Sequence, residues 1–131
     1  MISTSANPAV GNSVDHYFQA LNNLDREAYL ACFSDDAVVR DPYGGRVLRG
    51  QDGLNKFMDG LERTWTRFQM TPKESFAAGN RVAVSWTAGG TAKSGKTADF
   101  AGINVFTLDE AGLIHQLDGY WDFKAMAAQI S

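Results

Sequence analysis

Cysteine, histidine and net positive charge are all scarce in this sequence, and each shortage excludes a class of protein. The one cysteine, Cys32, cannot form an internal disulfide, and its helical pattern is typical of a small buried hydrophobic residue. The two histidines, His16 and His115, are far apart and belong to no Cys or His cluster, so we expect no metal site. The net charge of −3 provides no basic surface for nucleic acid.

Long apolar runs and targeting signals are also missing. No apolar run reaches the roughly 20 residues that cross a membrane, and residues 1–7 lack the basic residues and apolar centre of a signal peptide. The 131 residues, 44% of them hydrophobic, suit one folded domain. We therefore expect a single cytoplasmic domain over residues 1–131, with residues 1–8 as a flexible tail and with no membrane or nucleic-acid partner.

The first half of the chain has the apolar spacing of helices. Asp25 is typical of a helix N-cap, and we expect the run from Ser34 to Asp36 to end the helix that Asp25 begins. A short strand closed by Asp41 and an extended piece over residues 46–49 should follow. The expected helices run from Pro8 to about residue 21, from Asp25 to about residue 33, and over residues 51–64.

From Trp65 onward the apolar period changes from helical spacing to two, which is the period of strands. Helices followed by long antiparallel strands predict an α+β fold. Three helices would cover a curved antiparallel sheet to make a cone, whose mouth could bind a small molecule. The expected strands cover residues 67–77, 81–91, 97–108 and 113–123, followed by an Ala-rich tail over 124–130.

Asp41 is the first candidate catalytic residue. It shares a strand face with Ala37 and Val39, because alternate residues of a strand point to the same side. A carboxylate at the end of this apolar face could act inside the cone. The alternative is that Asp41 only opens the turn at Pro42, since Asp before Pro is a common turn starter.

Two more polar residues lie in otherwise apolar rows. Asn104 is the single polar side chain on a strand face that includes Phe100 and Phe106, and Tyr17 lies on the apolar face of the first helix. Each could be a core residue whose polar group is satisfied locally. Together with Asp41 they would supply one base and two hydrogen-bond donors in one apolar cavity. Proton abstraction beside a carbonyl needs that set of groups.

The cavity wall and the outer face of the sheet follow from the same alternation. The last strand would place Leu113, His115 and Leu117 on one face, where His115 is interpreted as a satisfied or solvent-edge histidine rather than a base. Both faces of the strand over 97–108 are largely apolar, which favours a homodimer through the outer face of the sheet. The expected wall residues are Phe57, Trp86, Phe100, Leu117 and Trp121.

Over residues 10–123 the chain resembles the nuclear transport factor 2-like (NTF2-like) superfamily, and within it the ketosteroid isomerase-like, SnoaL-like branch. The resemblance is carried by the segment from Ser34 to Gly44 and by residues 109–114 with Tyr120-Trp121. It implies a cystatin-like cone. It also implies that Asp41 is the general base, that Tyr17 is an oxyanion-hole donor and that Asn104 replaces the family's protonated aspartate.

This resemblance implies a Δ5-3-ketosteroid isomerase-type proton transfer through an enolate, on a hydrophobic substrate and without a cofactor. Two alternatives stay open. A SnoaL-like polyketide cyclase would use Asp41 for an aldol closure, with His115 as its candidate second acid. A non-catalytic lipophile-binding dimer module would need Asp41 only for the turn. An epoxide hydrolase would need an Asp-Arg-Asp relay, and no inward arginine is found in the last strands.

Overall fold

The structure, a computed structural model, describes the backbone of residues 8–131 and the side chains from Ser13 onward. The tail expected over residues 1–8 lies outside the described residues except for Pro8, which begins the first helix. No helix in the described part of the chain is long and apolar enough to cross a membrane. The elements in chain order are α1 Pro8–Asn22, α2 Arg26–Ala31, β1 Phe33–Arg40, β2 Val47–Arg49, α3 Gly50–Thr64, β3 Trp65–Ala78, β4 Arg81–Ala92, β5 Thr97–Leu108, β6 Ile114–Tyr120 and α4 Phe123–Ile130.

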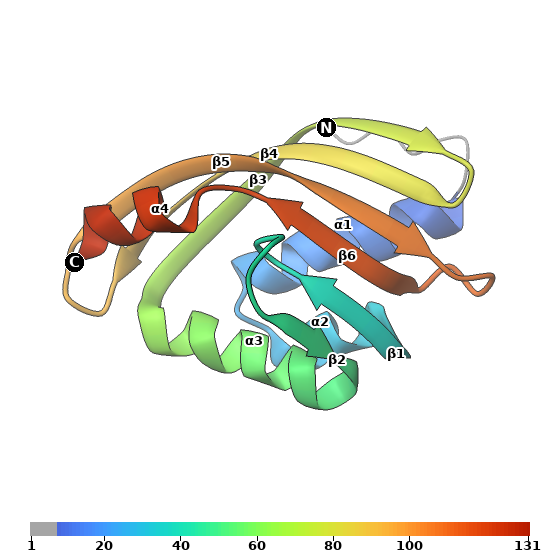
Figure 1. Cartoon of the computed structure of the whole chain (residues 1–131), viewed down its shortest axis with the longest axis horizontal. Helices are drawn as coiled ribbons and strands as arrows, with labels where there is room; N and C mark the ends of the chain where they lie inside the picture. The colour runs from blue at the N-terminus through green and yellow to red at the C-terminus, as the bar shows by residue number, and fades with distance from the viewer. Residues whose placement is uncertain (1–7) are drawn as a thin grey trace.

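The strands form one curved, unclosed sheet in the order β2-β1-β6-β5-β4-β3 (Figure 1). The pairs from β3 to β6 are antiparallel, as the sequence predicts. The strand β1 differs, because it pairs antiparallel with β2 but parallel with β6, where Arg40 lies opposite Asp118. The expected α+β class is therefore confirmed, with one parallel pair in a sheet that we expected to be wholly antiparallel.

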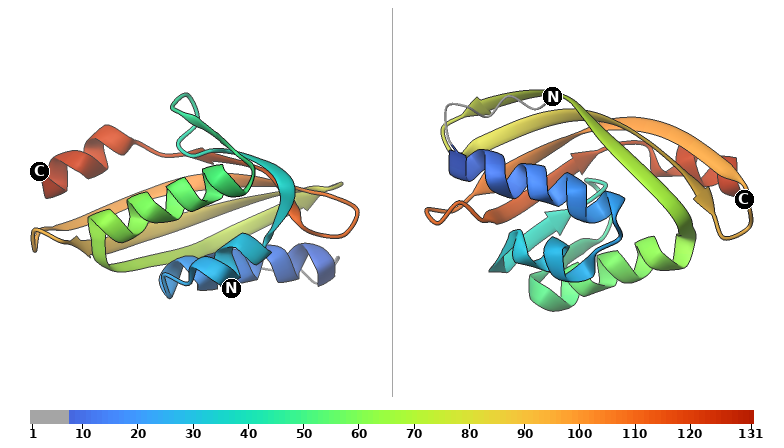
Figure 2. Two further views of the ribbon diagram at one scale, coloured as in Figure 1. Left: turned by 90° about the horizontal axis from the view of Figure 1, so that it is seen from below. Right: turned by 180° about the vertical axis from the view of Figure 1, so that it is seen from behind.

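The helices α1, α2 and α3 lie on the concave side of the sheet (Figure 2). Asp25 caps α2 as predicted, and its carboxylate accepts a hydrogen bond from the backbone N–H of Ala28 at 3.1 Å. The core fills the space between the helices and the sheet. The largest fully buried side chains include Trp86, Tyr17, Tyr29, Phe106, Leu21 and Leu54.

The second helix ends earlier than the sequence predicts. It ends at Ala31, and the run from Ser34 to Asp36 lies inside β1 rather than closing the helix. Phe33 is buried and pairs with Ile114 of β6, so tertiary pairing outweighs the turn preference of the Ser-Asp-Asp run. An irregularity in the β1–β6 pairing accommodates this polar run.

The last strand differs from the prediction in both its length and its faces. A register shift pairs Ile114 with Leu108 but Gln116 with Thr107, so His115 is an extra, unpaired residue. Such a bulge moves the alternation by one position. Ile114 is therefore buried and His115 is exposed, and the predicted common face of Leu113, His115 and Leu117 is wrong.

The Ala-rich tail folds into α4, which lies over one end of the sheet (Figure 1). Asp122 caps this helix by accepting from the backbone N–H of Ala125 at 3.0 Å. The side-chain amide of Gln129 bonds both backbone groups of Asp99 in β5, at 2.8 and 2.9 Å. These bonds hold α4 against β5, where it can close one end of the molecule's main cavity.

Candidate active site

A cavity of about 610 Å³ lies between the concave face of the sheet and the helices, a size that suits a small molecule. Four of the five expected wall residues line it, namely Phe57, Trp86, Phe100 and Trp121. Leu117 does not. It is fully buried in the core, where β6 pairs it with Phe106 on one side and Val39 on the other.

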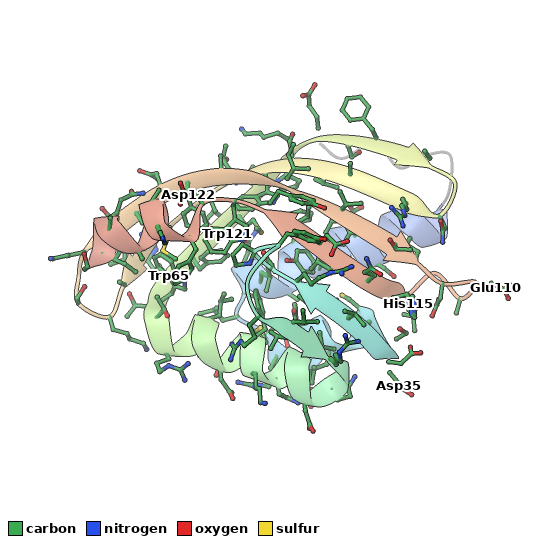
Figure 3. The ribbon with its side chains drawn as sticks, in the orientation of Figure 1. Asp35, Trp65, Glu110, His115, Trp121 and Asp122 are labelled. Carbon is green, nitrogen blue, oxygen red and sulfur yellow. The ribbon has the colours of Figure 1, made fainter. Side chains whose placement is uncertain are left out.

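Aromatic rings make a continuous wall along one side of this cavity. The Phe100 ring lies 5.8 Å from Trp86, 5.3 Å from Trp121 and 6.3 Å from Trp65, measured between centroids. Figure 3 shows Trp65 and Trp121 on the inner side of the sheet, near α4. Trp65 and Phe68 also line the cavity and were not predicted from the sequence, because a bulge after Trp65 turns these two residues, three apart, to the same side.

Asp41 follows the last residue of β1 and lines the cavity. Its carboxylate Oδ1 accepts a hydrogen bond from Trp121 Nε1 at 2.6 Å. The turn after it is tied to β6, since the backbone N–H of Tyr43 donates to Gly119 O at 2.7 Å. Asp41 is the one acidic side chain among the described residues that line the cavity.

Burial raises the pKa of Asp41 to about 6, and the hydrogen bond from Trp121 acts in the opposite direction. Desolvation prevails because the carboxylate faces an apolar wall rather than water. A carboxylate with a pKa near 6 is largely ionised at pH 7 and is still a stronger base than an ordinary aspartate. General base catalysis requires that combination.

Tyr17, Asn104 and Trp86 form a chain of hydrogen bonds in which Tyr17 and Trp86 line the cavity and Asn104 lies behind them. Trp86 Nε1 donates to Asn104 Oδ1 at 3.0 Å, and Asn104 Nδ2 donates to Tyr17 Oη at 3.3 Å. An indole N–H can only donate, so it fixes the amide with its oxygen toward Trp86 and its nitrogen toward Tyr17. Because Tyr17 accepts from Asn104, its own O–H remains available to donate elsewhere.

The structure brings Tyr17 and Asp41 to the same cavity but leaves Asn104 behind it. Asn104 is fully buried and is not among the residues that line the cavity. Its predicted contact with a substrate oxygen stays a prediction, whereas its contact with Tyr17 is direct. Burial raises the pKa of Tyr17 well above its ordinary value, so its hydroxyl keeps its proton.

Gly119 leaves the space that the Asp41 carboxylate occupies. A Cβ atom at this position would collide with Oδ1 of Asp41 and would lie 3.0 Å from Oδ1 of Asn104. The carboxylate and the amide therefore approach the same point of the β6 backbone. A larger residue would displace the Asp41 carboxylate, which gives this glycine a steric role in the site.

His115 lies far from this site. In Figure 3 it is at the opposite end of the molecule from Trp121, and its Nδ1 lies 3.5 Å from both Ser34 Oγ and Asp36 Oδ1. It does not line the cavity. No group of three or more metal-ligating side chains occurs within the described residues.

Comparison with known proteins identifies the family. The model of the SnoaL-like domain matches residues 14–117, so the chain belongs to the SnoaL-like family of the NTF2-like superfamily. Comparison with curated proteins gave no match.

Solved structures agree with this assignment. Δ5-3-ketosteroid isomerase from Mycobacterium sp. is 29% identical with a TM-score of 0.79, covering 90% of this chain and 96% of its own. A candidate polyketide cyclase from Xanthomonas campestris pv. campestris is 21% identical with a TM-score of 0.84, covering 95% and 98%. A Mycobacterium tuberculosis protein in complex with estradiol-17beta-hemisuccinate is 23% identical with a TM-score of 0.80, covering 89% and 96%.

The glycine beside Asp41 gives the first prediction. Gly119→Ala should lower the free energy of unfolding by about 1–3 kcal/mol, because the added methyl overlaps the carboxylate. Urea denaturation measures this change. The control is Gly60→Ala in α3, which lines the same cavity and has 3.9 Å to its nearest neighbour. It should be neutral or stabilising by about 0.5–1 kcal/mol. Equal stability of Gly119→Ala and the parent would contradict the close contact.

The raised pKa of Asp41 gives a prediction about stability and pH. Its pKa is about 6 in the folded chain against 3.8 when exposed, so the folded chain binds this proton more tightly than the unfolded chain. The resulting contribution to the free energy of unfolding is fully present below pH 3.8 and is lost as the pH rises through about 6. Asp41→Asn removes this loss and should raise stability at pH 7 by up to about 3 kcal/mol. Denaturation of both proteins at pH 3.5 and pH 7 tests this. A difference that does not grow with pH would show that the pKa is not raised.

Proposed function

We propose that this protein is an isomerase that moves a proton within an apolar, unsaturated ketone through an enolate, as Δ5-3-ketosteroid isomerase does. One observation carries the proposal. A carboxylate of raised pKa, Asp41, and a tyrosine that keeps its proton, Tyr17, line the same apolar cavity. Such a pair suits the removal of a proton from carbon with stabilisation of the oxygen that becomes negative.

Asp41 is the proposed base and proton carrier. Its Oδ1 is bonded to Trp121, which leaves Oδ2 to accept the proton. The C–H bond beside the ketone breaks, its electron pair forms a C=C bond, the π pair of the carbonyl moves onto oxygen as an enolate, and an O–H bond forms on Asp41. Asp41 then delivers the proton to the γ-carbon, the carbonyl re-forms with the remaining double bond in conjugation, and the carboxylate is regenerated. The steps balance without an oxidant, a reductant or a cofactor.

Tyr17 is the proposed donor to the enolate oxygen, and Asn104 supports it. Asn104 gives its N–H to Tyr17 Oη, which directs the hydroxyl proton away from the amide and toward the cavity. A hydrogen bond received by a donor strengthens the bond that the donor makes. Asn104 thus acts through Tyr17 in this proposal, and Trp86 acts through Asn104 by fixing its orientation.

Similarity to the Mycobacterium ketosteroid isomerase supports the choice of reaction, and the steroid-bound M. tuberculosis structure supports a flat hydrophobic ligand. The polyketide cyclase alternative is weaker, because its candidate second acid, His115, lies outside the cavity. An epoxide hydrolase relay would need a second acid beside Asp41, and the described cavity residues include none. The non-catalytic binding module is the alternative that an activity assay separates.

The proposal includes a cytoplasmic homodimer formed through the outer face of β5 and β6. Ile103 and Tyr120 pair across these strands on that face, and each is 47% exposed. Tyr43 stacks on Tyr120 with 5.5 Å between the ring centroids and extends the apolar surface. Burying these rings against a second copy would remove their apolar area from water.

Isomerisation of a Δ5-3-ketosteroid, followed by the absorbance of the conjugated product, tests the proposal. Asp41→Asn should be inactive, and kcat/KM of the parent should rise with pH through about 6 as Asp41 ionises. Tyr17→Phe should lower kcat about 10²–10³-fold by removing one oxyanion donor. The control is Tyr29→Phe, because the buried Tyr29 hydroxyl has no partner among the described residues. Absence of turnover in the parent would favour the binding-module alternative.

The role of Trp86 is tested separately. Trp86→Phe removes the N–H that orients Asn104, so the amide can turn its oxygen toward Tyr17 and accept the proton that the substrate needs. We expect kcat to fall about tenfold with KM little changed. Trp65→Phe removes a ring from the same wall, and the Trp65 indole makes no hydrogen bond to the described residues. It should change KM rather than kcat. The same kinetic effect in both variants would rule out orientation by Trp86.

A further inference from the structure

The solvent end of the cavity is basic. Four basic side chains line the cavity, Arg46 in the β1–β2 loop, Lys56 and Arg63 in α3, and Lys124 in α4. All four residues are exposed, whereas Tyr17 is fully buried. The cavity therefore has an apolar interior with the proposed catalytic groups and a cationic mouth formed by three separate parts of the chain.

The concentration of positive charge here is unusual for this protein. The chain has 12 Lys and Arg against 15 Asp and Glu, with a net charge of −3. A third of the basic residues nevertheless line one cavity, where Asp41 is the one described acid. Ordinary surface mixing of charges would place acids among these bases.

Two of the three acids of α3, Asp59 and Glu62, form ion pairs with α2 rather than with the cations of the mouth. Arg26 of α2 lies 2.7 Å from Asp59 and 2.9 Å from Glu62, measured between the guanidinium nitrogen and the carboxylate oxygens. Lys56 and Arg63 lie seven residues apart and both line the cavity, whereas the three acids of α3 do not line it. In the described part of the chain, none of the four mouth cations forms an ion pair with a carboxylate.

We propose that the natural ligand carries an anionic group, a carboxylate or a phosphate, on the end of its apolar skeleton remote from the ketone. The ketone enters the interior toward Asp41 and Tyr17, and the anion stays at the mouth among Lys56, Arg63 and the other two cations. This inference rests on the proposed function for the direction in which the ligand enters. Each exposed ion pair contributes little by itself, but several cations on one anion add their effects and also speed its capture.

A matched set of ligands tests this inference by binding, without need of turnover. Estradiol, its 17β-hemisuccinate, the methyl ester of that hemisuccinate and the 17β-phosphate share one ring system and differ in the charge at the remote end. Titration calorimetry at low ionic strength should give about tenfold tighter binding of the hemisuccinate than of its methyl ester. The difference should shrink as salt is added. The relative affinity of the phosphate and the carboxylate tells which anion the mouth prefers.

Paired variants locate the effect. Lys56→Gln with Arg63→Gln should reduce the preference for the acid over the ester to about threefold or less, and should leave estradiol affinity within about twofold. The control is Arg67→Gln with Lys73→Gln on β3, which removes the same charge from exposed residues outside the cavity. It should keep the preference of the parent.

The outcomes separate this inference from the proposed function. Equal affinity for the acid and the ester, no binding of either, or an equal loss of preference in both paired variants overturns the anionic ligand. A clear preference for the acid without isomerisation of a ketosteroid supports the anionic ligand and overturns the isomerase. Isomerisation of a ketosteroid without a preference for the acid supports the isomerase and overturns the anionic ligand.

Discussion

The hydrogen bond from Trp121 to Asp41, at 2.6 Å, is the contact on which the site depends. Asp41 follows β1 and Trp121 follows β6, so the two side chains meet because these strands run parallel and side by side. An antiparallel pair would bring the end of one strand to the start of the other. The bare backbone of Gly119 then leaves room for the carboxylate. Strand direction, one indole and the absence of a side chain at residue 119 together position the Asp41 carboxylate.

Burial of Asp41 lowers the stability of the fold at pH 7 and raises the basicity of the carboxylate. A carboxylate with a pKa of about 6 is a destabilising charge at pH 7, and the fold tolerates it because the surrounding rings are firmly packed. The buried hydroxyl of Tyr29, which has no partner among the described residues, is a further polar cost close to the site. Tyr17 avoids that cost by accepting from Asn104. Polar groups that work against stability thus cluster around the cavity, as expected where a site rather than a core is being built.

The sequence was informative where one face of one element decided the outcome. Strand and helix periods identify Asp41 and Tyr17 as inward-facing, and both do line the cavity. The same reasoning could not find the parallel pairing of β1 with β6, because period two is the same for both directions. It failed at His115, since a bulge shifts the alternation without a local signal in residue type. It failed at Leu117 because an inward face does not tell which side chains line the cavity and which are covered by the core. The cationic mouth combines side chains from several segments of the chain, so the periodic pattern of a single segment does not predict it.

In the proposed function, the two ends of the cavity divide recognition from reaction. Exposed cations at the mouth are screened by water and salt, so they would select and capture a charged ligand but would contribute little to a proton transfer in the interior. Around Asp41 and Tyr17 the wall is apolar, so a single hydrogen bond there has a larger effect on a developing charge. Binding energy gained at the remote end can then hold the ketone in place for the base, since contacts away from the reacting atoms can offset the cost of orientation. Contacts between flat hydrocarbon surfaces do not by themselves fix which carbon of the ligand faces Asp41. A charged contact at the remote end of the ligand would fix it.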